Sequence, residues 1–109
     1  MLRFKPEVRV AYFHHLLAMA LEYACVWSLR TGIDVDVNSV NDSVHGATSL
    51  HAYDLAIDFD TSGDKPADLV KLHAWLARYL PDEFDVILEG DHVHVEIDRR
   101  RKAPHAPPH

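Results

Sequence analysis

The stretch DHVHVE, residues 91–96, alternates side chains that can bind metals with aliphatic ones. Successive side chains of a β-strand point to opposite faces, so a strand here would place His92, His94 and Glu96 together on one face. Two imidazoles and a carboxylate side by side are side chains of the kind that bind zinc. The spacing therefore raises the question of a metal site on the surface of a strand.

Two further side chains of this kind, His51 and Asp58, lie upstream. A catalytic zinc ion commonly takes three protein ligands and leaves a fourth position for water, and His51, Asp58 and His94 would supply such a set. Asp58 and His94 fall on the polar faces of two predicted strands, which as neighbours about 4.8 Å apart could direct both side chains to one point. His51 would approach from a loop, and a nearby carboxylate would act as general base toward water activated by the metal.

The segments that carry these residues resemble the zinc D-Ala-D-Ala metallopeptidases, a family also named for its LAS or hedgehog-like fold. SLHAYDLAIDF, residues 49–59, is similar to the family motif S-x-H-x-x-G-x-A-x-D, with Asp54 where the family usually has glycine. DHVHVE is similar to a second motif, in which an acid stands three residues before the last histidine ligand. SLRTG, residues 28–32, is similar to a segment in which an arginine helps to hold the substrate, and Arg30 is the corresponding residue.

The resemblance implies zinc bound by His51, Asp58 and His94, with Asp91 as the general base. Asp91 is three residues from His94, so it can serve only if the turn at Gly90 or a bulge redirects it. Glu89 is the second candidate for the base, with the same difficulty.

His92 has two open roles: it would hydrogen-bond the tetrahedral intermediate, or orient a metal ligand as its neighbour. Its pairing with His94 as His-x-His looks like the endopeptidase and hedgehog branches of the family. Glu96 either orients a metal ligand by bonding to it or is a solvated residue.

The resemblance further implies hydrolysis of peptidoglycan stem peptides, as a D,D-carboxypeptidase or an L-Ala-D-Glu endopeptidase. Small members of this kind are frequent among phage endolysins, which reach the cell wall with the help of a separate holin. Two alternatives stay open: a zinc-binding module that does not hydrolyse its ligand, and a phage structural or accessory protein whose histidines carry no metal.

Composition predicts one monomeric domain without a nucleic-acid partner. The chain has 109 residues and a net charge of −6 with histidine counted neutral, which argues against binding to nucleic acid. We expect one domain, 1–98, followed by a basic, proline- and histidine-rich disordered tail, 99–109. The apolar stretch 11–27 is interrupted by polar residues, so neither a membrane span nor a signal peptide is expected. The protein would be made in the cytoplasm.

Hydrophobic periodicity predicts an α+β fold with a mostly antiparallel sheet and two main helices. The expected elements are a helix over 6–25, an extended segment over 26–30, strands over 33–37 and 53–59, a polar loop over 38–49, a helix from Pro66 to about 80, and a hairpin with strands over 84–88 and 92–97.

Overall fold

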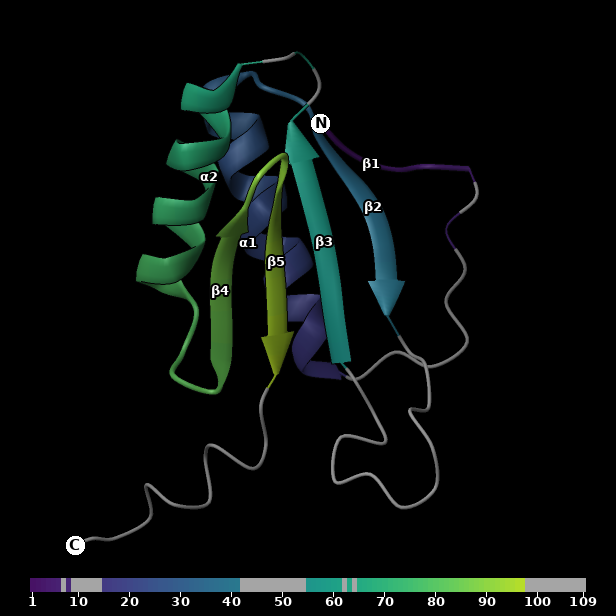
Figure 1. Cartoon of the computed structure of the whole chain (residues 1–109), viewed down its shortest axis with the longest axis vertical. Coiled ribbons are helices and arrows are strands. Elements are labelled where there is room, and N and C mark those ends of the chain that lie inside the picture. Colours follow the sequence, from purple (N-terminus) through teal and green to yellow (C-terminus); the bar gives the residue numbers. More distant parts are fainter. Residues whose placement is uncertain (7, 9–14, 42–54, 62, 64, 98–109) are drawn as a thin grey trace, which may run out of the picture.

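The computed structural model describes residues 1–6, 8, 15–41, 55–61, 63 and 65–97. Its elements follow in the order β1 (Leu2–Phe4), α1 (His15–Thr31), β2 (Val35–Asn41), β3 (Leu55–Thr61), α2 (Pro66–Tyr79), β4 (Phe84–Glu89) and β5 (His92–Ile97). The strands form one sheet in the order β1-β2-β3-β5-β4 (Figure 1). Every strand pair is antiparallel except β1 with β2. The predicted α+β class, with a mostly antiparallel sheet and two main helices, is confirmed.

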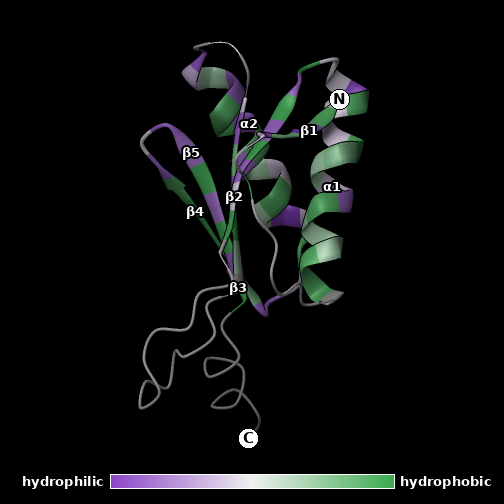
Figure 2. Cartoon of the chain, turned by 90° about the vertical axis from the view of Figure 1, so that its right-hand side faces the viewer, coloured by the Kyte–Doolittle hydropathy of each residue, from purple (hydrophilic) through white to green (hydrophobic). Residues whose placement is uncertain are grey.

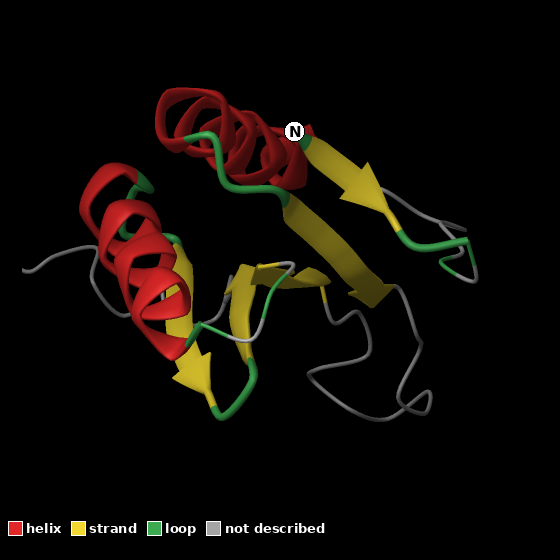
Figure 3. Ribbon diagram, turned by 90° about the horizontal axis from the view of Figure 1, so that it is seen from above, coloured by secondary structure: helices red, strands yellow, loops and turns green. Residues whose placement is uncertain are grey.

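Both helices pack on the same face of the sheet, as the view from above shows (Figure 3). The core lies between these two layers, and strand alternation decides which side chains enter it. The strand residues that are fully buried are Val35, Val37, Ile57, Phe59, Val93 and Val95. Hydrophobic and hydrophilic residues accordingly alternate along the strands in Figure 2. The opposite face of the sheet, here called the open face, carries mostly polar side chains, with Ala56 and Ile87 as exceptions.

Helix α2 agrees with its prediction. It begins at Pro66, whose missing amide hydrogen costs nothing in a first turn, and its inner stripe of Leu69, Leu72 and Leu76 is buried. The amide of Leu80 donates to the carbonyl of Leu76, and the helix ends there before a proline.

Helix α1 differs from the expectation for this part of the chain. The segment 26–30, predicted to be extended, is helical. The buried face of α1 includes Ala20, Ala24 and Trp27, so helical spacing continues past the point where the helix was expected to stop. The helix ends instead at Gly32, whose amide donates to the Ser28 carbonyl and whose φ is +77°. The beginning of the predicted helix is also wrong, because Pro6 lies in a turn.

The first strands also correct the prediction. Leu2–Phe4 was not expected to be a strand, yet it pairs in parallel with β2. The strand expected over 33–37 begins at Val35 and continues to Asn41, so the first part of the segment predicted as a loop is strand. The rest of that loop and residues 98–109 lie outside the described residues. Among the described residues, no helix is both long enough and apolar enough to cross a membrane.

The C-terminal hairpin is confirmed. Strands β4 and β5 are antiparallel, and Glu89 pairs with His92 across a two-residue loop of Gly90 and Asp91. Gly90 has a φ of +50°, a conformation that glycine adopts without the steric cost of a side chain.

We predict that the core stripe of α2 carries much of the stability of the fold. Leu72→Ala should lower the free energy of unfolding by about 2–5 kcal/mol, because Leu72 is fully buried and its truncation leaves a cavity. Val70→Ala on the same helix is the control, since Val70 is 51% exposed and its loss should change stability by about 0.5 kcal/mol or less. Urea unfolding of both variants measures the difference; equal effects would contradict the assigned helix face.

Candidate metal site on the open sheet face

The open face of the sheet collects most of the polar side chains singled out in the sequence. Its residues on the four strands β2 to β5 include Asp36, Asn38, Ser39, Asp58, Asp60, Glu89, His92, His94 and Glu96. Neither of the two described helices covers this face.

Asp58 and His94 are direct partners across β3 and β5. The Nδ1–H of His94 donates to Oδ1 of Asp58 over 2.7 Å, and its Nε2–H donates to Oε1 of Glu96, also over 2.7 Å. About a quarter of each side chain of the Asp58–His94 pair is exposed. The structure therefore brings together two of the three predicted zinc ligands.

A β-bulge in β2 adds a residue that the sequence analysis missed. The register with β3 shifts between Val37 and Ser39, so that Ser39 lies opposite Asp58. The hydroxyl of Ser39 donates to Oδ2 of Asp58 over 3.0 Å. Simple alternation places residues 37 and 39 on the same face, so only knowledge of the bulge would have revealed this contact.

The charges of the pair reinforce each other. The hydrogen bond to Asp58, and after it the bond to Glu96, raises the pKa of His94 to about 9, although partial burial opposes this. For Asp58 burial is the largest influence and would raise the pKa, but the hydrogen bonds from His94 and Ser39 and the nearby imidazoles together lower it. The face thus holds a positive charge between carboxylates.

His92 lies beside this pair and is bonded to both candidate bases. Its Nδ1–H donates to Asp91 over 2.9 Å and its Nε2–H to Glu89 over 3.1 Å, while Nε2 is 4.0 Å from Oδ1 of Asp58. The hydrogen bond to Asp91 is the main cause that raises the pKa of His92.

The hairpin places the two candidate bases differently from what the sequence analysis expected. Glu89 lies on β4 opposite His92 and shares its face, so the alternation difficulty expected for it does not apply. Asp91 lies in the turn, and its side chain is 98% exposed. The turn conformation, and not strand alternation, brings it next to His92.

Arg30 is not brought to the site. It lies on α1, in the helical layer on the other face of the sheet, and its guanidinium is 5.7 Å from the centre of the Trp75 ring. The expected substrate contact of Arg30 is therefore not supported, because the segment that carries it is helical and not the end of a strand.

The predicted third ligand, His51, lies outside the described residues, as does Asp54. Among the residues that are described, no group of three or more histidine, cysteine, aspartate or glutamate side chains is arranged to hold a metal ion. The described part of the site thus consists of the Asp58–His94 pair and its neighbours.

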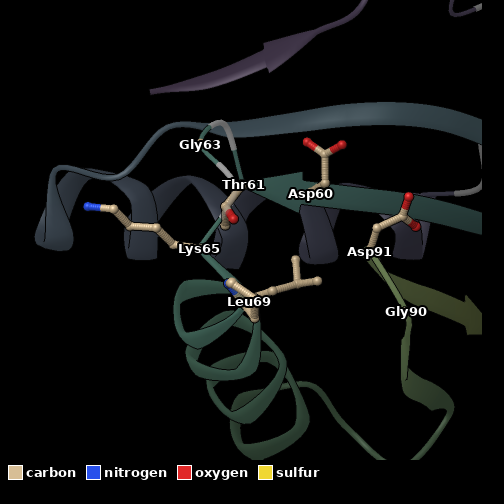
Figure 4. A pocket seen from close by; sticks show the side chains of 8 residues that line it. Asp60, Thr61, Gly63, Lys65, Leu69, Gly90 and Asp91 are labelled. Carbon is tan, nitrogen blue, oxygen red and sulfur yellow. The ribbon is translucent and has the colours of Figure 1, made fainter.

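A pocket of about 290 Å³ lies at the end of the sheet that carries Asp60 and Asp91 (Figure 4). It lies between the end of β3, the start of α2 and the β4–β5 turn, and is lined by Asp60, Thr61, Gly63, Lys65, Pro66, Leu69, Gly90 and Asp91. Asp91 belongs both to the pocket wall and to the group of side chains around His92, whereas Asp58, His92 and His94 do not line the pocket.

Comparison of the chain with models of protein families, with curated proteins and with solved structures gives no significant match.

The pKa of His94 is directly measurable in protein treated with a chelator. Because its folded pKa of about 9 lies above the ordinary value of 6.5, His94 should stabilise the fold fully below about pH 6.5 and lose this contribution as the pH rises through 9. Asp58→Asn should bring the pKa of His94 down toward 6.5. NMR titration of the imidazole, with its signal assigned by comparison with His94→Gln, measures the pKa of His94 in the unaltered protein and in Asp58→Asn. An ordinary pKa in the unaltered protein would rule out the Asp58–His94 bond.

Proposed function

We propose that the protein is a zinc-dependent peptidase that hydrolyses peptidoglycan stem peptides, as a D,D-carboxypeptidase or an L-Ala-D-Glu endopeptidase of the endolysin type. The observation that carries the proposal is the Asp58–His94 pair, 2.7 Å apart on neighbouring strands and on the sheet face opposite to the two helices. These are two of the three residues that the motif resemblance gives as zinc ligands.

The pair fits a zinc ion in its chemistry. Two ligand atoms of a tetrahedral zinc site lie about 3.3 Å apart, given bond lengths of about 2.0–2.1 Å, so a small rotation of either side chain would make room. Metal-bound histidines usually donate their second N–H to a carboxylate, and Glu96 already accepts the Nε2–H of His94. Oδ1 of Asp58 and Nδ1 of His94 would hold the ion, with His51 as the third ligand.

Zinc bound there would supply a Lewis acid for the attack of water on a peptide carbonyl. The protein itself supplies the proton acceptor: Asp91, or else Glu89, would take the proton of the attacking water. His92 bonds both carboxylates, so it is placed to orient whichever of them acts.

The open face also offers room for an extended substrate. Both helices lie on the other face, and the pocket beside Asp91 begins where β3 ends. A peptide whose scissile bond lies at Asp58 and His94 would have space in this pocket for a neighbouring side chain. We expect the protein to act on the wall peptide as a monomer.

A second candidate is a module without hydrolytic activity. Both nitrogens of His94 are bonded to carboxylates, so the group is complete as a charge cluster without a metal. Asp91, with 98% of its side chain exposed, is not fixed over the pair. A structural or wall-binding role of the same face is favoured by these two observations, and metal content and hydrolysis distinguish it from the peptidase.

Metal content is the first test. The purified, untagged protein should contain about one zinc per chain by elemental mass spectrometry, because three ligands on one domain bind zinc tightly. His94→Ala and His51→Ala should lose the metal. His73→Gln is the matched control, since His73 bonds the Val86 carbonyl away from the site and should leave the zinc in place. Absence of metal after incubation with zinc would refute the proposal.

The base is tested by turnover. Asp91→Asn should keep its zinc and lower the hydrolysis of stem peptides by about 10²–10⁴-fold, as expected for loss of a general base. Glu89→Gln is its matched control and should retain most activity. Products are identified by mass spectrometry, which also names the bond cleaved. The reverse pattern would assign the base to Glu89, and zinc-loaded protein without any hydrolysis would favour the second candidate.

A further inference from the structure

A bulge in β2 interrupts the regular pairing of the sheet next to the candidate site. Val37 pairs with Phe59 and Ser39 pairs with Asp58, so two steps along β2 match one step along β3. Beyond the bulge Val40 is 5% exposed and takes the place in the core that alternation would have given to residue 39. The inserted residue thus turns Ser39 from the helix-covered face to the open face.

Each oxygen of the Asp58 carboxylate consequently has a different partner. Oδ2 accepts the hydroxyl of Ser39 over 3.0 Å, and Oδ1 accepts the Nδ1–H of His94 over 2.7 Å. A carboxylate bonded from two sides has its plane and its rotation fixed, and hydrogen bonds to a charged group are stronger than those between neutral groups. Oδ1 is thereby directed toward β5.

We propose that Ser39 is a positioning residue that holds Asp58 in the orientation of a metal ligand binding through one oxygen. The proposal rests on the proposed function for the identity of the metal. With Oδ2 engaged by Ser39, only Oδ1 faces His94, and this favours the four-coordinate geometry of zinc over ions that need many oxygen ligands. On this proposal, the functional consequence of the bulge is that it brings the Ser39 hydroxyl to Asp58.

The substitutions Ser39→Ala and Ser39→Thr test the proposal with zinc itself as the probe. Ser39→Ala should weaken zinc binding by about 10–100-fold in a competition titration with a chelator, the usual effect of losing a bond to a metal ligand. Ser39→Thr keeps the hydroxyl and should restore the affinity. Ser28→Ala is the matched control: it removes a buried hydroxyl that bonds the Ile33 carbonyl, and should lower stability without changing zinc affinity.

A second measurement needs no metal. NMR coupling constants should report a single χ1 rotamer for Asp58 in the unaltered protein and in Ser39→Thr, and averaging over rotamers in Ser39→Ala. If the unaltered protein binds no zinc, the proposed function fails, and the rotamer result alone decides the role of Ser39. Wild-type zinc affinity, or one fixed Asp58 rotamer, in Ser39→Ala would overturn the positioning role.

Discussion

The pairing of β3 with β5 is the constraint on which the candidate site depends. Ile57 and Phe59 on one strand and Val93 and Val95 on the other are fully buried beneath the helices. Each contributes about 1.5–3 kcal/mol through burial, and a slip of either strand by one residue would turn its own two side chains away from the core. The register that buries these side chains is also the one that puts Asp58 opposite His94. The hydrophobic core therefore fixes the polar pair without any requirement that the pair be strong itself.

The same alternation explains why the two described helices both pack on one face of the sheet. The hairpin of β4 and β5 brings Glu89 and Asp91 to the end of the sheet where His92 lies. The polar pair and its neighbours consequently lie together on the open face, and Asp91 of this group also lines the pocket at the end of the sheet. The single layer of strands thus carries the hydrophobic core on one face and the polar side chains of the candidate site on the other.

Local patterns in the sequence predicted the second helix and the C-terminal hairpin, but misplaced the first helix. Helix α2 and the hairpin each carry their own periodicity and turn residues, so both were found, and the shared face of His92, His94 and Glu96 followed from alternation. Strand β1 could not be found in this way, because its parallel pairing with β2 depends on contacts far apart in the chain. Arg30 was misplaced because VWSLR reads as extended by residue type, whereas Trp27 continues the buried face of α1. The bulge at Ser39 leaves no local signal, since it depends on how β2 matches β3.

The central question of the site is which cation lies between its carboxylates. Asp58 and Glu96 flank His94, and their combined negative charge requires a compensating positive charge at the imidazole. A proton satisfies this requirement, and for that reason the pKa of His94 rises to about 9. A zinc ion at Nδ1 would satisfy it as well, with Glu96 still accepting the Nε2–H, but only after the Nδ1 proton had left. In the proposed site zinc and the proton would therefore compete for the same nitrogen, and the zinc affinity would rise with pH until that proton is lost. A metal would have to displace the strong hydrogen bond between Asp58 and His94. A third ligand such as His51 would add the binding free energy that favours zinc over the proton.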